Sequence, residues 1–415
     1  MSRRWLPTQV SVVSAVIGVL GASALAEWPQ FRGADRSGVS ADQGLLKQWP
    51  EAGPPRKWLF RKAGLGYSGP SISNATVYLM GTRDGKEVLI ALNEAEGTER
   101  WAVPLGAIYE NGWGDGPRGT PTVDEERVYA LSGTGDLVCA KVADGKILWR
   151  CGMSDFGGSV AAWGYCESPL VDGHRLVCSP GGDRGSIVAL DKLTGDLIWQ
   201  SADVIEGAQY ASIVPADING TRQYIQLFMH TLVSVNADDG GLIWDSPWDG
   251  STAVVSTPIV RGRQVYVSSG YNAGSKLVEI NDQNEAIEAF GNKVMKNHHG
   301  GVIRVGDHVY GYSDAGWVCQ DFATGETVWS EKDRLGKGAI GCADGMLYCI
   351  DERDGTVALI EASPEGWNEH GRFSLDPLTE LRKPSGGVWT HPVIANGCLY
   401  LRDQELLFCY NVRES

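Results

Sequence analysis

The sequence predicts an all-β fold: an eight-bladed β-propeller of four-stranded blades, with the last blade closed by an N-terminal strand. A strand-rich unit recurs at intervals of about 40–50 residues. Glycine-containing turns separate the strands of each unit. The last unit lacks one strand, and a matching strand lies near the N-terminus. A closed ring removes the free strand edges that an open array would leave. Two packed β-sandwiches are the alternative, but they explain neither the period nor the displaced strand.

The clearest unit begins at Ser168-Pro169 and ends at Trp199. Asp172-Gly173 and Thr194-Gly195 supply residues typical of tight turns. Ile187-Val188-Ala189-Leu190 is a continuous apolar run, typical of a strand buried on both faces. The closing tryptophan is a large apolar side chain suited to packing between neighbouring sheets. The unit therefore reads as four strands with an aromatic residue at the end.

Copies of this unit cover almost the whole chain. Seven copies end in an aromatic residue: Trp101, Trp149, Trp199, Trp244, Phe290, Trp329 and Phe373. The eighth copy opens at His391-Pro392 and ends without such a residue. Arg56–Phe60 supplies the missing strand, because Trp58 precedes Trp101 by about one repeat length. We therefore expect an N-terminal extension at 27–55 and the propeller at 56–415.

The first 26 residues have the pattern of an export signal. Arg3 and Arg4 precede the apolar stretch Val10–Leu20, and Ala24-Leu25-Ala26 fits a cleavage site before Glu27. An uncleaved anchor is the alternative, although the apolar run is shorter than the ~20 residues of a membrane span. We expect a periplasmic or secreted protein with no membrane span after cleavage.

The composition is that of a globular protein with a negative surface. The formal charge is −15, hydrophobic residues make up 43% and charged residues 21%. This balance, with no basic stripe between aromatic residues, excludes nucleic acid as a partner. No G-x-S-x-G sequence supports a serine hydrolase. We expect a monomer.

The nine cysteines form an odd set for an exported chain. If Asp403-Gln404 is a two-residue hairpin turn, Cys398 lies opposite Cys409 at a separation that a disulfide can span. The alternative is two small buried strand residues.

Residues just before each first strand are expected to gather at one mouth of the central channel. One residue per blade and several neighbours form this candidate ligand face: Tyr67, Trp113, Asp115, Arg118, Glu167, Gln209, Tyr210, Ser256, His298, His299, Lys337, Trp389 and His391. Cations, histidines and aromatic rings that converge in this way are typical of a binding pocket. A solvated channel rim is the alternative.

The pattern Leu190-Asp191, Thr194-Gly195 and Trp199 resembles the tryptophan-docking repeat of PQQ-like propellers. That superfamily includes quinoprotein alcohol dehydrogenases and the outer-membrane protein assembly factor. Trp28–Gly33, Asn297–Gly301 and His391–Gly397 resemble segments of secreted PQQ-like repeat proteins from planctomycete-type bacteria. The resemblance implies a propeller fold and says little about function.

The resemblance also raises the question of PQQ with calcium as a cofactor. Arg118 and Lys337 could meet its carboxylates, Trp113 or Trp389 could stack on its rings, and Glu167 could ligate calcium. Against this, the chain has no adjacent cysteines and no evident carboxylate–amide set to complete the calcium site and supply a base.

The histidines do not predict a metal site of their own. His298 and His299 are adjacent, so in a strand they point to opposite faces, and His391 adds only one more ligand. We therefore expect a non-catalytic binding or scaffolding module for an unidentified protein, glycan or small molecule. The alternatives are a PQQ-dependent alcohol dehydrogenase and a partner-binding assembly factor.

Overall fold

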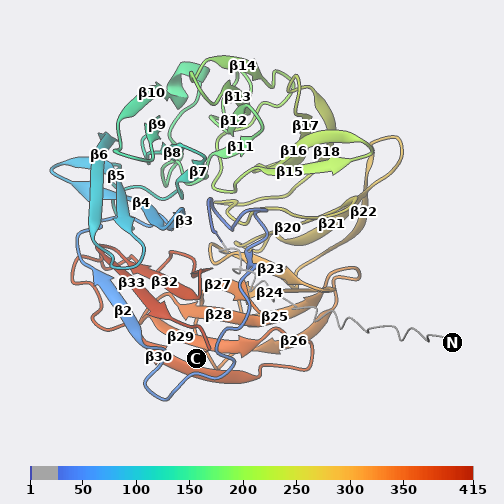
Figure 1. The fold of residues 1–415 in the computed structure, drawn as a ribbon. Coiled ribbons are helices and arrows are strands. Elements are labelled where there is room, and N and C mark those ends of the chain that lie inside the picture. The colour runs from blue at the N-terminus through green and yellow to red at the C-terminus, as the bar shows by residue number, and fades with distance from the viewer. Residues whose placement is uncertain (2–26, 415) are drawn as a thin grey trace.

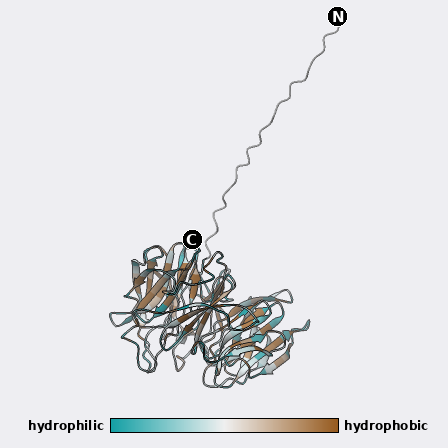
Figure 2. Ribbon diagram, turned by 90° about the horizontal axis from the view of Figure 1, so that it is seen from below, coloured by the Kyte–Doolittle hydropathy of each residue, from teal (hydrophilic) through white to brown (hydrophobic). Residues whose placement is uncertain are grey.

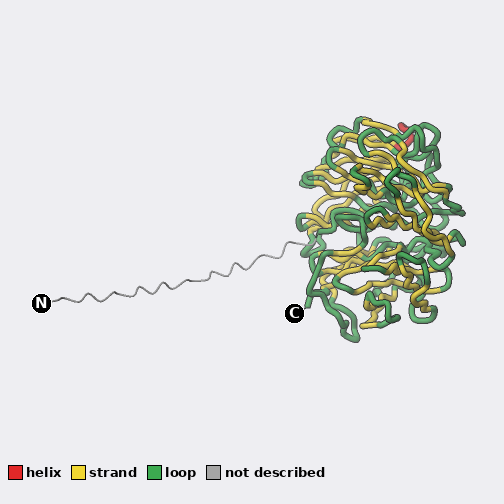
Figure 3. Tube along the Cα trace, turned by 90° about the vertical axis from the view of Figure 1, so that its right-hand side faces the viewer, coloured by secondary structure: helices red, strands yellow, loops and turns green. Residues whose placement is uncertain are grey.

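The computed structural model describes Met1 and residues 27–414. The predicted signal peptide, residues 1–26, lies outside the described residues except for Met1. Figure 1 shows a ring of sheets around a centre, and Figure 3 shows that strands and loops make up nearly all of it. Within the described range, no helix is long and apolar enough to cross a membrane.

The first four blades follow one another along the chain, each as an antiparallel four-stranded sheet. Their strands are β3 (Ser71–Ser73), β4 (Thr76–Arg83), β5 (Lys86–Asn93) and β6 (Glu99–Ala107); β7 (Thr122–Asp124), β8 (Arg127–Leu131), β9 (Asp136–Lys141) and β10 (Ile147–Gly152); β11 (Leu170–Asp172), β12 (Arg175–Cys178), β13 (Val188–Asp191) and β14 (Leu197–Gln200); and β15 (Val214–Ile218), β16 (Thr221–Leu227), β17 (Thr231–Asn236) and β18 (Leu242–Pro247). The 3₁₀ helix η1 (Met153–Phe156) follows β10.

The next four blades complete the ring. Their strands are β19 (Ile259–Arg261), β20 (Gln264–Ser269), β21 (Gly274–Ile280) and β22 (Ala286–Asn292); β23 (Val302–Val305), β24 (His308–Ser313), β25 (Gly316–Asp321) and β26 (Thr327–Glu331); β27 (Gly338–Ala343), β28 (Met346–Asp351), β29 (Thr356–Glu361) and β30 (Glu369–Ser374); and β31 (Val393–Ala395), β32 (Cys398–Asp403) and β33 (Leu406–Asn411) with β2 (Arg56–Phe60). β2 pairs antiparallel with β33. The prediction of eight blades closed by an N-terminal strand is confirmed.

The hydrophobic core lies between successive blades. One cluster joins Tyr78 and Met80 of β4 to Val128 and Ala130 of β8, and all four side chains are fully buried. Figure 2 shows the hydrophobic residues on the strands. The middle strands, such as β5 and β28, are buried on both faces, which explains the continuous apolar runs in the sequence, whereas an outer strand such as β22 is mostly exposed.

The repeated Trp and Gly form a contact between neighbouring blades. Trp149 at the end of blade 2 packs on Tyr129 of its own blade, with ring centroids 6.1 Å apart. Its indole Nε1 donates to the Lys192 carbonyl oxygen of blade 3 at 3.1 Å. Gly195 has a φ of +80°, and a Cβ added there would lie 2.8 Å from the Trp149 ring. Only glycine meets both conditions, so this turn selects it.

The predicted hairpin turn near the C-terminus is wrong by one residue. Asp403 pairs with Leu406, so Gln404 and Glu405 form the turn, and Cys409 lies opposite Tyr400. Asp403 stays in the strand because its buried carboxylate accepts a hydrogen bond from Arg382 Nη2 at 2.6 Å. Cys398 therefore pairs with Asn411 and not with Cys409, and the cysteines are all free thiols in the described chain.

Candidate functional site

The N-terminal extension runs through the middle of the ring, a role that the sequence did not reveal (Figure 1). Trp28 exchanges backbone hydrogen bonds of 2.9 and 2.8 Å with Ile72 in β3. Val123 N in β7 donates to the Pro29 carbonyl at 2.8 Å. Further along, the two-residue strand β1 (Val39–Ser40) pairs in parallel with β27 of blade 7. We call residues 28–38 the plug, because they cross the channel from blade to blade.

Two buried arginines fix the plug. Arg36 Nη1 donates to the Ile213 carbonyl at 2.9 Å, and Nη2 donates to the Pro169 carbonyl at 2.5 Å. Arg32 Nη2 donates to the Val302 carbonyl at 2.8 Å. Burial lowers the pKa of both guanidinium groups to about 10, so both remain charged at neutral pH. The plug is thus bound to carbonyls that start the innermost strands on both sides of the ring.

A cavity of about 730 Å³ lies between the plug and the loops of one channel mouth. The plug contributes Trp28, Phe31 and Arg32 to its wall. Of the residues proposed from the sequence, the following line it: Tyr67, Trp113, Arg118, Tyr210, Ser256, His298, His299, Lys337, Trp389 and His391. These side chains come from the segments before the first strands of seven blades.

The other three proposed residues point elsewhere. Asp115 Oδ1 accepts a hydrogen bond of 2.7 Å from Lys383 Nζ, and this contact joins two loops at the mouth. Glu167 is buried in blade 3 and accepts a hydrogen bond from Ser179 N; burial raises its pKa to about 7. Gln209 Oε1 accepts a hydrogen bond of 3.2 Å from Val254 N, which lies in the loop between β18 and β19. None of the three lines the cavity.

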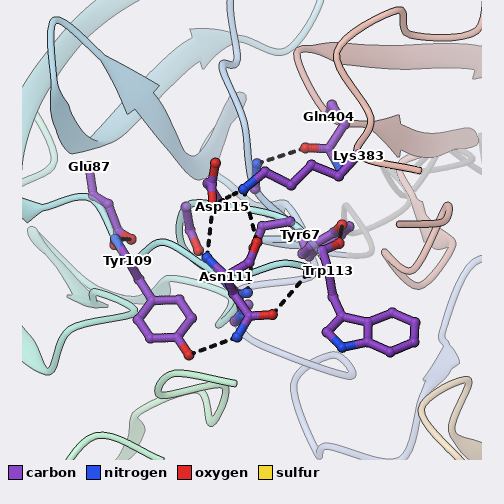
Figure 4. A network of polar contacts seen from close by, with 12 residues as sticks. Tyr67, Glu87, Tyr109, Asn111, Trp113, Asp115, Lys383 and Gln404 are labelled. Atoms are coloured by element: carbon purple, nitrogen blue, oxygen red, sulfur yellow. Dashed lines mark hydrogen bonds and ion pairs between the residues drawn. The ribbon is translucent and has the colours of Figure 1, made fainter. Parts of the chain in front are cut away.

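Figure 4 shows how the loop after β6 is held at the mouth. Lys383 Nζ reaches the Asn111 carbonyl at 2.9 Å as well as Asp115. Tyr67 Oη donates to the Trp113 carbonyl at 2.7 Å. The buried Glu87 carboxylate accepts Tyr109 N at 3.0 Å, and burial raises its pKa to about 7. The loop that carries the Trp113 ring is therefore fixed before any ligand binds.

Aromatic rings form much of the cavity wall. The Tyr67 and Trp389 centroids lie 4.9 Å apart, and Trp113 lies 6.4 Å from Trp389. The His299 ring meets Trp389 edge to face at 5.1 Å. The Arg118 guanidinium lies 5.7 Å from the Tyr67 centroid. This wall can bind a planar apolar body by stacking and desolvation.

Another part of the cavity wall is polar and consists of a cluster of hydrogen-bonded side chains. His299 Nε2 lies 2.6 Å from Glu352 Oε2, and its Nδ1 lies 3.0 Å from His298 Nδ1. Lys337 Nζ lies 2.6 Å from His298 Nδ1 and 3.4 Å from Glu352 Oε1. His298 Nε2 lies 2.5 Å from Tyr271 Oη. His391 stands apart from this cluster, with Nε2 donating to the His299 carbonyl at 2.8 Å.

Burial dominates the protonation of the two histidines. It lowers the pKa of His298 to about 3, helped by the charges of His299 and Lys337. Burial also lowers the pKa of His299, although the Glu352 carboxylate opposes it. For Glu352, burial raises the pKa, but the hydrogen bond from His299 and the charge of Lys337 outweigh it and lower the pKa overall. Glu352 is therefore an anion at neutral pH, and His298 is neutral.

The sequence reasoning missed Glu352, Tyr271 and Arg353, which also line the cavity. Tyr271 lies in the turn between β20 and β21, and Glu352 and Arg353 lie between β28 and β29. These are turns between second and third strands. A four-stranded meander returns to the same edge after two strands, so such turns meet the starts of the first strands at one mouth. This alternation is the signal that could have found them.

A family model described as outer membrane protein assembly factor BamB matches residues 85–331. The chain belongs to this family. Its fold is that of the PQQ-like β-propellers. No curated protein sequence matches the chain.

Solved structures share this fold at low sequence identity. BamB from Moraxella catarrhalis is 14% identical, with a TM-score of 0.62 over 86% of this chain and 99% of that one. Quinohemoprotein alcohol dehydrogenase from Comamonas testosteroni is 11% identical, with a TM-score of 0.63 over 94% and 81% of the two chains. A europium-containing methanol dehydrogenase is 10% identical, with a TM-score of 0.63 over 91% and 89%. These similarities concern the fold alone.

The residues present do not fit PQQ held by calcium. In the described part of the chain, no group of three His, Cys, Asp or Glu side chains converges as a metal site. Glu352 is the one carboxylate that lines the cavity, and its oxygens face His299 and Lys337. Calcium needs six to eight oxygen ligands, so this carboxylate alone cannot hold it.

Proposed function

We propose that this member of the BamB family is an exported, non-catalytic binding protein whose central cavity holds a small planar ligand. The observation that carries the proposal is the cavity of about 730 Å³ between the plug and the mouth loops. Its size suits a single small molecule, and its wall includes the Tyr67, Trp113 and Trp389 rings.

The mouth supports this proposal because it is ordered by its own contacts. The Lys383–Asp115 ion pair joins the loop before β31 to the loop before β7. Trp113 is 49% exposed, yet its loop is tied down by Asn111 and Tyr67. A site that is rigid before binding loses less conformational freedom on binding. An ordinary wet channel rim has no need of such ties.

Calorimetric titration of the purified protein with PQQ, in EDTA and in calcium, tests the proposal. We expect binding in EDTA, weakened about fivefold by Trp113→Leu. Trp367→Leu is the matched control, since Trp367 does not line the cavity. Binding that requires calcium would overturn the proposal in favour of a dehydrogenase cofactor site. Absence of binding by both PQQ and the neutral 2-naphthamide at millimolar concentration would also overturn it.

A second candidate function follows from the family match alone: assistance in outer membrane protein assembly. The matched residues 85–331 span the blades from β5 to β26. The test is binding of a urea-unfolded outer-membrane β-barrel protein after dilution, measured by fluorescence anisotropy. Submicromolar binding that Trp113→Leu leaves unchanged would favour this function, because it would not use the cavity. Binding no tighter than to an unfolded control protein of similar charge would exclude it.

A further inference from the structure

The cavity has more cationic than anionic groups although the protein is acidic. Among the residues that the structure describes, four cationic side chains line it, Arg32, Arg118, Lys337 and Arg353, against the single carboxylate of Glu352. The formal charge of the whole chain is −15. Burying or enclosing unpaired like charges is unfavourable, so a positive cavity in a negative protein points to an anionic ligand.

Glu352 supplies the carboxylate among these charged side chains, and it already contacts two neighbouring residues. Glu352 Oε2 accepts His299 Nε2 at 2.6 Å, and Oε1 faces Lys337 Nζ at 3.4 Å. Arg353 differs, because its guanidinium makes no hydrogen bond to any residue that the structure describes, while its backbone N–H donates to Asp351 Oδ1 at 2.8 Å. A ligand therefore meets donors in this region, while the charge of the Glu352 carboxylate is balanced by Lys337 and its Oε2 accepts from His299.

The direction of the hydrogen bonds around His298 follows from the neighbouring lysine. An ammonium group can only donate, so Lys337 donates to His298 Nδ1. Neutral His298 then carries its proton on Nε2 and donates to Tyr271 Oη at 2.5 Å. The Tyr271 hydroxyl hydrogen is left free, and Tyr271 lines the cavity with 40% of its surface exposed. Lys337 thus makes Tyr271 a donor toward the cavity.

We propose that Tyr271 and Lys337, which are joined through His298, form a donor corner that recognises a carboxylate on the planar ligand. This inference deepens the proposed function and rests on it. The corner offers a phenol and an ammonium, and a carboxylate accepts from both. The Arg353 guanidinium adds positive charge to the same cavity wall. The ligand class is therefore an aromatic carboxylate, with its rings on the aromatic wall and its charge at the corner.

The experiment compares 2-naphthoate with 2-naphthamide, which have the same rings and nearly the same shape. We expect the wild-type protein to bind naphthoate at least about tenfold more tightly in calorimetric titration, because hydrogen bonds to a charged group are the stronger ones. Equal affinity for the two probes would overturn the donor corner while leaving the planar-ligand cavity intact. If neither probe binds but PQQ binds in EDTA, this inference alone is overturned; if PQQ fails to bind as well, the proposed function is overturned with it.

Tyr271→Phe tests the corner itself. It removes one hydroxyl from a partly exposed ring, and we expect about a fivefold loss for naphthoate with less than about a twofold change for naphthamide. Tyr312→Phe is the matched control, since Tyr312 does not line the cavity. Lys337→Met should reduce the preference for naphthoate further, because it removes a charge and frees His298 to donate to His299. Equal losses for both probes in Tyr271→Phe would contradict the proposal.

Discussion

Arg36→Lys should destabilise the whole ring although it keeps the positive charge. The Arg36 side chain reaches four acceptors: the carbonyls of Ile213, Ser168 and Pro169, and Gln30 Oε1. Arg36 as a whole is 2% exposed. These acceptors are spread around three nitrogen atoms of a planar group, and the single nitrogen of lysine cannot face them all.

The expected cost follows from the bonds that lysine cannot make. Each hydrogen bond to a charged donor contributes about 1.5–3 kcal/mol, and a buried carbonyl left without a donor loses its share. If lysine keeps two of the four contacts, the free energy of unfolding falls by about 3 kcal/mol or more. A change of this size is a large fraction of the total stability of an ordinary protein.

Urea unfolding followed by tryptophan fluorescence measures this cost. Arg263→Lys is the matched control, because Arg263 is exposed and pairs with Asp282 at the surface; it should cost less than about 1 kcal/mol. We expect a lower midpoint for Arg36→Lys with an unchanged slope. A loss below about 1 kcal/mol in Arg36→Lys would refute the view that the plug holds the ring together through this side chain.

Three further predictions concern the repeat, a buried acid and the mouth. Gly195→Ala should lower the free energy of unfolding by at least about 1 kcal/mol more than Gly173→Ala does. Both glycines have a positive φ, but only Gly195 contacts the Trp149 ring. The urea midpoints of the two variants give the comparison. Burial raises the pKa of Glu167 to about 7, so the folded protein keeps a proton that the unfolded chain releases above its ordinary 4.5. Wild type should therefore lose stability relative to Glu167→Gln as the pH rises from about 5 to about 7, by up to about 1.4 kcal/mol per pH unit; a constant difference across that range would contradict the argument. Lys383→Met should raise hydrogen exchange in residues 108–118, measured by mass spectrometry, because it releases the loop tied in Figure 4; unchanged exchange would show that other contacts suffice.

The ring was predictable because its signals are local and repeated. In four blades a turn glycine meets the tryptophan that closes the preceding blade, as Gly195 meets Trp149, and this pairing recurs in the sequence about once per repeat. The closing strand was also predictable, since a strand was missing at one end and present at the other. The Cys398–Cys409 hairpin was not, because its register depends on a buried ion pair between Asp403 and Arg382.

The plug could not be read from the sequence because nothing in it repeats. Trp28, Arg32 and Arg36 are held by carbonyls from blades that lie far away along the chain, such as Val302 and Ile213. These hydrogen bonds can form only once the ring has brought the distant blades together. The resemblance of Trp28–Gly33 to secreted repeat proteins marked the segment, but only the contacts explain why an arginine is needed there.

The candidate site was predicted only in part, because the sequence analysis used the starts of the first strands and not the turns after the second strands. Taking the start of each first strand gave Tyr67, Lys337 and His391, which do meet in one cavity. Strand alternation brings the turns after each second strand to the same mouth, and this rule would have added Tyr271 and Glu352. Both residues contact the groups predicted from the sequence. Glu352 accepts a hydrogen bond from His299 and pairs with Lys337. Lys337 donates to His298, which directs the other ring nitrogen of His298 to donate to Tyr271. The ring of first-strand residues alone suggested an undirected mixture of charges. With the second turns included, Glu352, Lys337, His298 and Tyr271 form one connected set of polar contacts, and the aromatic carboxylate that we propose would meet its last member, Tyr271.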